Sequence, residues 1–352
     1  MTHAGALTHL RRSIGVVLLA LAAAAGPLRA QVPQRPDADG PLATRTLEFA
    51  DLSDAARSGR RLPIKIHLPD GSGPFPVVVL SHGGGGSWDA NHAQARHLAS
   101  HGYAVLALDH PGSNTEVMRK GMRFIANLQA MTRDAGEVLG RPADVRFALD
   151  QAERWNRDHA QLTGRLNLSR VGMLGHSYGA YTTLVACGAR PALDWLVPAV
   201  PPGRGLGPDL SDPRIKACVA LSPQGPGEPF FLETSYATID RPVLGISGSR
   251  DAQQGAAPEH RRRFFELVPP GGKVLVWLAN ADHLAFSDSS GSARSGLPSR
   301  SRADAQPIVR AATLLFFEQH LRGSAEAGAR LSEAGLAPLA RGVVDRIEVL
   351  RK

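Results

Sequence analysis

The sequence predicts a single α/β domain built on a mostly parallel sheet with helices on both faces. Short aliphatic runs alternate with longer segments of helical periodicity, a pattern typical of parallel strands joined by crossover helices. The run Pro76–Leu80 is apolar without a break, as expected for a strand buried on both faces. With 352 residues, the chain is also long enough to bury a full core.

The expected elements extend along most of the chain. The strands are short aliphatic or β-branched runs, and the helices are recognised by apolar residues that recur about every 3.6 positions, as in Asp144–Arg157. The expected strands are Arg61–Leu68, Pro76–Leu80, Ala104–Leu108, Arg170–Leu174, Ile215–Leu221, Pro242–Ile246 and Lys273–Leu278. The expected helices are Asn91–His101, Asp144–Arg157, Ala180–Cys187, Glu259–Leu267 and Ile308–Leu321.

The first thirty residues have the pattern of an export signal. Arg11 and Arg12 form a charged region, Ile14–Ala25 is an apolar stretch, and Ala30 offers a small residue for cleavage. The apolar stretch is shorter than the roughly 20 residues that a bilayer span needs, although an uncleaved membrane anchor is the alternative. We expect an exported (periplasmic or secreted) chain without a transmembrane segment, a flexible lead-in over residues 31–43, and one domain over residues 44–352.

The net charge of +8 and the pI of about 10.1 first suggest a nucleic-acid partner. Three arginines lie in the expected signal, however, so cleavage lowers the net charge to +5. The densest basic run, Arg261–Arg263, lies in an expected helix, and no nucleic-acid-binding signature occurs. We therefore expect a solvated basic surface and no nucleic-acid partner; an anionic membrane surface is compatible with the charge.

The cysteines and the clustered histidines do not predict a metal site. Cys187 and Cys218 lie in an expected helix and the following strand, where two buried free thiols are the preferred interpretation and a disulfide is the alternative. His92, His97 and His101 share one expected helix but lack the glutamate of an H-E-x-x-H motif. We expect a solvated helix there, no metal and no organic cofactor.

The strongest signal is Gly175-His176-Ser177-Tyr178-Gly179, which follows an apolar strand and opens a helix. A sharp strand-to-helix turn leaves its central residue strained, with the side chain exposed near a helix N-terminus. That position favours a developing anion. The pattern therefore indicates that Ser177 is a nucleophile.

A serine nucleophile needs a base, and in this topology an acid and then a histidine follow it along the chain. Asp251 and His283 each lie just beyond a later expected strand, so we expect His283 as general base and Asp251 as its orienting acid. Asp282 adjoins His283 on extended chain and points elsewhere, and Asp240 precedes its strand and lies at the wrong end of the sheet.

The glycine run Gly83–Gly86, after strand Pro76–Leu80, offers bare backbone for an oxyanion. We expect the N–H groups of Gly84 and Tyr178 to form the hole, with Gly83 or Gly85 as alternatives to Gly84. A phosphate cradle is the other interpretation of a glycine run, but no G-K-[ST] follows.

The candidate pocket residues are His176, Phe230 and Phe231. The two phenylalanines belong to Pro223–Ile239, a proline-rich loop that covers substrate or is an ordinary surface loop. His176 and His110 do not fit the order of the triad, so they line the pocket or support the turn.

With these residues the chain resembles the serine α/β-hydrolases, in particular the bacterial group of predicted dienelactone hydrolases. This group is similar to platelet-activating-factor acetylhydrolases and cutinase-like polyester hydrolases. The segments that carry the resemblance are Val78–Gly86, Ala99–Asn114, Val171–Ala180, Gly248–Asp251 and Ala281–His283. It implies a carboxylic-ester hydrolase that uses Ser177, Asp251 and His283. True dienelactone hydrolases have a cysteine nucleophile, so the group name says little about the substrate.

We therefore expect a serine esterase that acts on a short- or medium-chain, lipid or polymer ester, as a monomer. A serine peptidase or amidase of the same fold is the first alternative, and a non-catalytic ligand-binding relative is the second. The complete set of serine, acid, histidine and glycine run argues against the second, because a binding protein needs none of them together.

Overall fold

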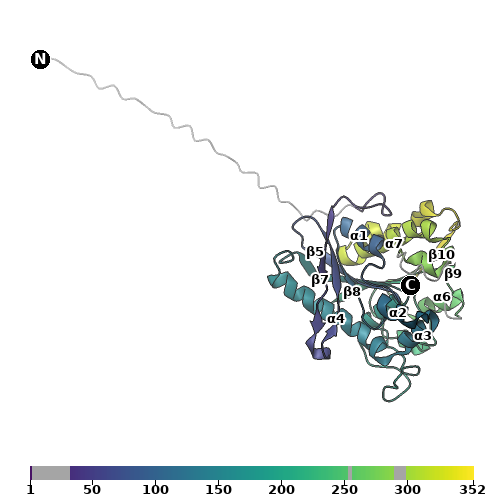
Figure 1. Cartoon of the computed structure of the whole chain (residues 1–352). Helices are drawn as coiled ribbons and strands as arrows, with labels where there is room; N and C mark the ends of the chain where they lie inside the picture. Colours follow the sequence, from purple (N-terminus) through teal and green to yellow (C-terminus); the bar gives the residue numbers. More distant parts are fainter. Residues whose placement is uncertain (2–31, 253–255, 289–298) are drawn as a thin grey trace. The chain divides into compact units, whose positions relative to one another are not determined.

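The central sheet of the computed structural model has nine strands, and the structure describes residues 1, 32–252, 256–288 and 299–352 (Figure 1). The strand order is β1-β4-β6-β5-β7-β8-β9-β10-β11. Neighbours from β6 to β10 pair in parallel, whereas β1, β4 and β11 pair antiparallel at the two sides. The strands are β1 Thr44–Phe49, β4 Ile64–Pro69, β5 Phe75–Ser81, β6 Ala104–Leu108, β7 Leu166–His176, β8 Ile215–Leu221, β9 Val243–Arg250, β10 Lys273–Asp282 and β11 Ile347–Arg351, with a small hairpin of β2 Ser53–Asp54 and β3 Arg60–Arg61.

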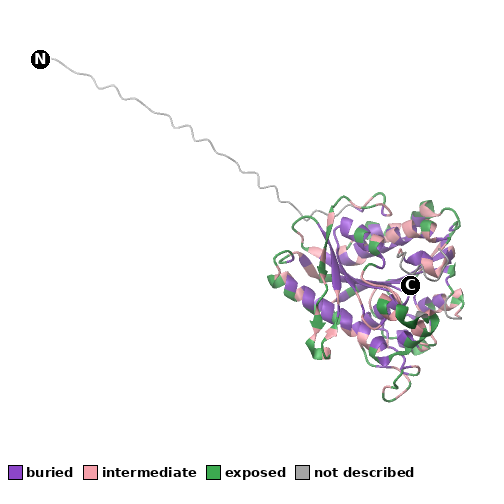
Figure 2. Cartoon of the chain, viewed as in Figure 1, coloured by how far each residue is buried: buried purple, intermediate pink, exposed green. Residues whose placement is uncertain are grey.

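Helices cover both faces of the sheet, and each face has its own hydrophobic cluster (Figures 1 and 2). Strand β5 contributes to both, because Val77 and Val79 point to one face and Val78 and Leu80 to the other. The helices are α1 His92–Ser100, α2 Thr115–Arg119, α3 Phe124–Arg133, α4 Ala135–Asp158, α5 Tyr178–Ala186, α6 Pro258–Leu267, α7 Arg302–Arg322, α8 Ala325–Arg330 and α9 Glu333–Leu336. None of the helices within the described ranges is long and apolar enough to cross a membrane.

The expected fold class is confirmed, and so are two strands to the residue, Ala104–Leu108 and Ile215–Leu221. The long helix α4 differs from the expectation, because it begins at Ala135 rather than at Asp144. Asp134 caps it by accepting from the N–H of Glu137, and the helix continues through Pro142. Helices α2 and α3 and strand β11 were not predicted.

Residues 32–43 pack against the domain, so the expected flexible lead-in is wrong for this part. Val32 is buried, and the carbonyls of Pro36 and Ala38 accept from the Nε2–H groups of His97 and His101, each at 3.0 Å. His97 of α1 and His101, directly after α1, are therefore buried donors, so the expected solvated helix is wrong for these two residues. The expected export signal, residues 1–30, lies outside the described residues apart from Met1.

The two cysteines are joined as a disulfide, which was the alternative rather than the preferred interpretation. Cys187 follows α5, Cys218 lies in β8, and their Cα atoms are 6.6 Å apart, within the usual range for a disulfide. The bridge ties the helix that begins beside Ser177 to the neighbouring strand of the sheet.

Candidate active site

Ser177 lies on the sharp turn between β7 and α5, with backbone angles φ 55° and ψ −117°. A non-glycine residue adopts a positive φ only when its surroundings enforce it. Here the N–H of Ser177 donates to the carbonyl of Leu221 at 2.9 Å, and its own carbonyl accepts from the N–H of Ala180 at 2.8 Å. A Cβ on Gly175 would collide with the backbone of Gly179, so the two glycines leave room for the turn.

The structure brings Ser177, His283 and Asp251 together in one hydrogen-bonded line. The Nε2 atom of His283 is 3.0 Å from Ser177 Oγ, and its Nδ1 atom is 2.8 Å from Asp251 Oδ1. These residues follow β7, β10 and β9, whose carboxyl ends meet at one edge of the sheet. The hydroxyl of Ser247 donates to the other oxygen of Asp251 at 2.7 Å. Such a line suits proton transfer from a hydroxyl to an imidazole that a carboxylate orients.

Arg261 is a neighbour of this line that the sequence analysis did not identify. Its Nε atom is 3.0 Å from Asp251 Oδ1, and its Nη1 atom donates to the carbonyls of Ser222 and Pro223. Burial alone would raise the pKa of Asp251, but the charge of Arg261 and the contact with His283 outweigh it and hold that pKa well below its usual range. Asp251 therefore stays a carboxylate.

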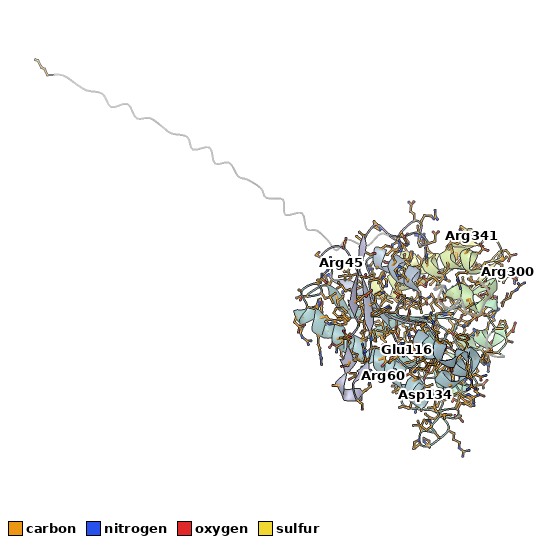
Figure 3. The ribbon with its side chains drawn as sticks, in the orientation of Figure 1. Arg45, Arg60, Glu116, Asp134, Arg300 and Arg341 are labelled. Carbon is orange, nitrogen blue, oxygen red and sulfur yellow. A yellow bond between two sulfur atoms is a disulfide. The ribbon has the colours of Figure 1, made fainter. Side chains whose placement is uncertain are left out.

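The expectation of a solvated basic surface is wrong for Arg261, which is only 5% exposed. Arg263 on the same helix is partly exposed and pairs with glutamates, and Arg45, Arg300 and Arg341 are exposed (Figure 3). A run of three arginines on a helix cannot all face solvent, because successive residues point about 100° apart.

His176 lies behind the imidazole of His283 and does not line the pocket. Its Nε2–H donates to the backbone carbonyl of His283 at 3.0 Å, and the two ring centres are 4.9 Å apart. Burial and the neighbouring His283 lower the pKa of His176 to about 3, so its ring is neutral. Asp282 caps the turn after β10 by accepting from the N–H of Leu284, away from the imidazole, as expected.

A cavity of about 60 Å³ opens beside Ser177. Phe230 lines it and stacks on the ring of Tyr178, with ring centres 5.1 Å apart. Phe231 does not line it: this side chain is fully buried and packs against Tyr236 in the core. The remaining lining residues come from α3, from the loops after β8 and β9, and from α6, namely Leu128, Thr132, Gln224, Gly225, Gly227, Glu228, Pro229, Ala256, His260 and Arg261.

The glycine run after β5 lies directly against the nucleophile. A Cβ on Gly83 would be 3.4 Å from the Cβ of Ser177, and one on Gly84 would be 4.0 Å from the ring of Tyr178. The N–H of Gly85 donates to the carbonyl of Ser113 at 2.8 Å, so Gly85 is not available as an oxyanion donor. Among the described residues, the N–H groups of Gly84 and Tyr178 donate to no protein acceptor.

A family model described as "alpha/beta hydrolase fold" matches residues 76–193. The structure is also similar to that of a ferulic acid esterase from Streptomyces cinnamoneus, with a TM-score of 0.54 and 22% sequence identity. This match covers 81% of the present chain and 91% of the esterase. The chain has the α/β-hydrolase fold.

The expected resemblance to platelet-activating-factor acetylhydrolases and cutinases is also confirmed. The chain is 27% identical to the platelet-activating factor acetylhydrolase of Cavia porcellus over 35% of its length and 34% of that relative. It is 22% identical to the cutinase est2 of Thermobifida alba over 62% of the chain and 56% of the cutinase. A hydrolase of Aspergillus flavipes, ffsE, is 31% identical over 44% of the chain. The chain thus spans between 27% and 56% of these relatives' own lengths.

Proposed function

We propose that this α/β-hydrolase cleaves carboxylic esters through a covalent acyl-enzyme on Ser177. The observation that supports it most is the line from Ser177 Oγ through His283 to Asp251, which ends at a cavity. The acetylhydrolase and the cutinase that the chain resembles support the same class of reaction.

In the proposed reaction, His283 takes the proton of Ser177 as Oγ attacks the ester carbonyl. The carbonyl oxygen becomes an oxyanion and accepts from the N–H groups of Gly84 and Tyr178, which donate to nothing else among the described residues. The intermediate collapses, the C–O bond breaks, and His283 returns the proton to the leaving alcohol. Water then attacks the acyl-enzyme by the same route and releases the acid.

Asp251 and Arg261 prepare His283 for this role. The carboxylate of Asp251 accepts from Nδ1–H, so the tautomer with a bare Nε2 faces the serine. Arg261 and Ser247 hold the carboxylate in place from two further directions. The imidazole therefore cannot rotate without breaking a bond to a buried charge.

The cavity favours a short acyl group. Its volume of about 60 Å³ is well below the roughly 150 Å³ that holds a benzene molecule, so we propose substrates with an acyl chain of a few carbons. Leu128, Phe230 and the ring of Tyr178 supply apolar contacts. The disulfide supports the proposed export, because disulfides persist in oxidising compartments.

The test is hydrolysis of a small chromogenic ester, p-nitrophenyl acetate, by the unaltered chain and by Ser177→Ala. We expect kcat to fall at least about 1,000-fold in the variant. Ser169→Ala is the matched control, because Ser169 is an exposed serine whose hydroxyl, in the described part of the chain, donates only to Asn167. Full activity of Ser177→Ala would refute the acyl-enzyme.

Two further measurements separate the alternatives. A fluorophosphonate probe should label Ser177 stoichiometrically, whereas a non-catalytic ligand-binding protein would remain unlabelled. An anilide of the same acyl group should react far more slowly than the ester. Comparable rates for the amide and the ester would indicate a peptidase or amidase instead.

A further inference from the structure

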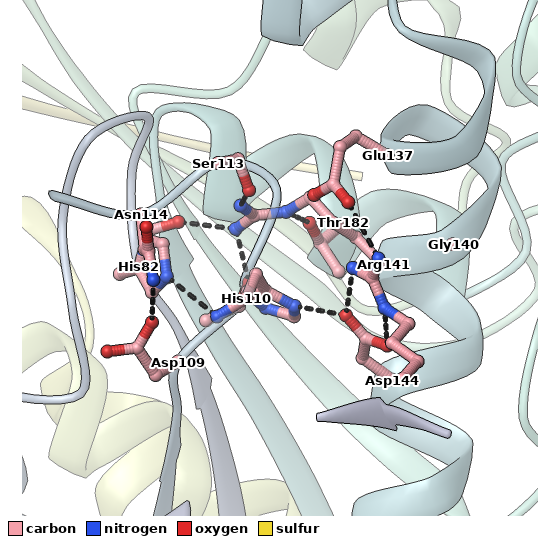
Figure 4. Close-up of polar contacts among 12 residues, drawn as sticks. His82, Asp109, His110, Ser113, Asn114, Glu137, Gly140, Arg141, Asp144 and Thr182 are labelled. Atoms are coloured by element: carbon pink, nitrogen blue, oxygen red, sulfur yellow. Dashed lines mark hydrogen bonds and ion pairs between the residues drawn. The ribbon is translucent and has the colours of Figure 1, made fainter. Parts of the chain in front are cut away.

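A second hydrogen-bonded line of a serine, a histidine and an aspartate lies inside the domain, behind the glycine run Gly83–Gly86 that we propose as part of the oxyanion hole. Ser81 Oγ is 2.9 Å from His110 Nε2, and His110 Nδ1 is 2.8 Å from Asp144 Oδ2. All three side chains are fully buried, and none lines the cavity beside Ser177. This line therefore has the geometry of a triad without access to a substrate (Figure 4 shows His110 and Asp144).

The protonation of this line follows from its surroundings. Burial and the nearby charge of Arg141 lower the pKa of His110 to about 3, so the ring is neutral at ordinary pH. Its Nδ1–H donates to Asp144, and its Nε2 accepts the hydroxyl proton of Ser81. The lone pairs of Ser81 Oγ are then left for the Nη2–H of Arg141, 2.9 Å away. Arg60 holds Asp144 from the other side, with Nε–Oδ1 at 2.8 Å.

The line therefore ends on Arg141, a fully buried arginine of α4. Its Nη1 donates to Ser113 Oγ at 2.6 Å, and its Nε donates to Thr182 Oγ1 at 2.8 Å (Figure 4). Its Nη2 also donates to the backbone carbonyl of His82. Within the described ranges, no carboxylate lies within ion-pair distance of this guanidinium. A buried cation without a carboxylate partner is costly, so its hydrogen bonds must hold it there.

These contacts reach both sides of the proposed oxyanion hole. On one side, His82 directly precedes the glycine run, and Ser113 accepts the N–H of Gly85 at 2.8 Å. Arg141 therefore fixes the loop before and after Gly84. On the other side, the guanidinium lies 4.3 Å from the ring centre of Tyr178.

We propose that Arg141 is a positioning residue for ester hydrolysis, which sets the Gly84 and Tyr178 N–H groups at the spacing that an oxyanion requires. The Ser81–His110–Asp144 line keeps the guanidinium in that orientation. The inference rests on the proposed function. An arginine suits this role because its planar fork presents five N–H donors in fixed directions, whereas a lysine ammonium has three donors at one nitrogen and cannot serve all four acceptors.

The variants that test this are Arg141→Lys, which keeps the buried charge, and Arg141→Met, which removes it. Arg322→Met is the matched control, because Arg322 also lies 4.3 Å from a tyrosine ring centre, that of Tyr103. Arg322 also donates to two backbone carbonyls and to Glu318, on the opposite face of the sheet. The readouts are kcat and KM for p-nitrophenyl acetate, the rate of fluorophosphonate labelling, and the thermal midpoint of each variant.

We expect both Arg141 variants to lower kcat and the labelling rate ten- to a hundredfold, with KM changed less than threefold. A misplaced oxyanion donor stabilises the transition state less, whereas the binding of the ester changes little. Arg322→Met should lower the thermal midpoint by a similar amount but leave kcat within twofold, measured well below all midpoints. If Arg141→Met does not fold, the kcat and the labelling rate of Arg141→Lys alone test the proposal.

Two outcomes would overturn the inference alone: kcat within twofold of the unaltered chain in Arg141→Lys, or an equal loss of kcat in Arg322→Met. An unaltered chain that neither hydrolyses the ester nor takes the label would overturn the proposed function, and this inference with it. The activity and labelling of the unaltered chain therefore distinguish a failure of this inference from a failure of the proposed function.

Discussion

The Nε2–H of His176 donates to the backbone carbonyl of His283 at 3.0 Å, so the residue before the nucleophile holds the residue that we propose as its base. The two residues are 107 positions apart, and their rings lie 4.9 Å from each other. The turn that carries Ser177 and the backbone of His283 are thus joined by a hydrogen bond that is separate from those of the triad.

Replacing His176 therefore tests this link. His176→Ala leaves the carbonyl of His283 without its donor. We expect kcat to fall about tenfold, which corresponds to an activation barrier raised by about 1.4 kcal/mol. His176→Gln keeps an N–H donor and should recover part of the loss. Ester hydrolysis at saturating substrate measures both. Equal activities of the two variants would show that the bond does not position His283.

Replacing Arg261 should make Asp251 sensitive to acid. An unfolded aspartate has a pKa of about 3.9, and the pKa of Asp251 in the folded state lies below it. The charge of Asp251 therefore contributes its full stabilisation of the folded state above the unfolded pKa. The contribution is lost only as the pH falls through the lowered folded-state value. In Arg261→Met that pKa rises, so the loss moves to higher pH.

Thermal midpoints between pH 3 and pH 8 measure this effect. At neutral pH we expect Arg261→Met to cost about 3–5 kcal/mol, because it leaves a buried charge without its partner. Arg263→Met removes a partly exposed arginine of the same helix, paired with glutamates, and should lower the thermal midpoint far less than Arg261→Met. Parallel pH profiles for the unaltered chain and Arg261→Met would contradict the assignment.

The glycines around the site should differ in what they tolerate. A Cβ on Gly179 would collide with the backbone carbonyl of Ser81, which cannot move, so Gly179→Ala should not fold. A Cβ on Gly84 would lie 2.8 Å from the end of the Leu128 side chain, which can shift. We expect Gly84→Ala to fold, with a circular dichroism spectrum like that of the unaltered chain, and to lose at least tenfold in kcat. Loss of folding in Gly84→Ala alone would contradict this.

The disulfide should stabilise the domain without contributing to the reaction. It closes a loop with a sequence separation of 31, for which loop entropy suggests about 3–4 kcal/mol. The double variant Cys187→Ala/Cys218→Ala should therefore unfold at lower denaturant concentration but keep kcat at 25 °C. Two reactive thiols in the denatured, unreduced protein would show that the bridge is absent.

The sequence predicts those parts of the structure that depend on local pattern. The strands are short apolar runs, and Ser177, Asp251 and His283 each follow one, so their meeting at one edge of a parallel sheet could be inferred. Helix α3 has few buried apolar residues to mark it, because Met131 is its only buried hydrophobic side chain and Leu128 lines the cavity.

Arg141 and Arg261 could not be inferred from the sequence for a different reason. The burial of each depends on carbonyls and hydroxyls from elements far apart in the chain, and one arginine in a helix carries no sign of them. For Arg141, the segment before Asp144 was not even predicted as helix, since Pro142 interrupts the pattern. The aspartate at position 134, followed by glutamate three residues later, was the available signal.

Phe230 and Phe231 offer a paired test of the acyl cavity, because the two adjacent rings lie in different environments. Phe230 lines the cavity beside Ser177, whereas Phe231 is fully buried in the core against Tyr181 and Tyr236. Phe230→Ala enlarges the cavity, so we expect the preference among p-nitrophenyl esters to move from acetate towards longer acyl chains. Phe231→Ala should instead cost about 3–5 kcal/mol of stability and leave the order of preference unchanged. Measured kcat/KM across acyl chains of two to eight carbons distinguishes the two, and an unchanged order in Phe230→Ala would place the acyl group elsewhere.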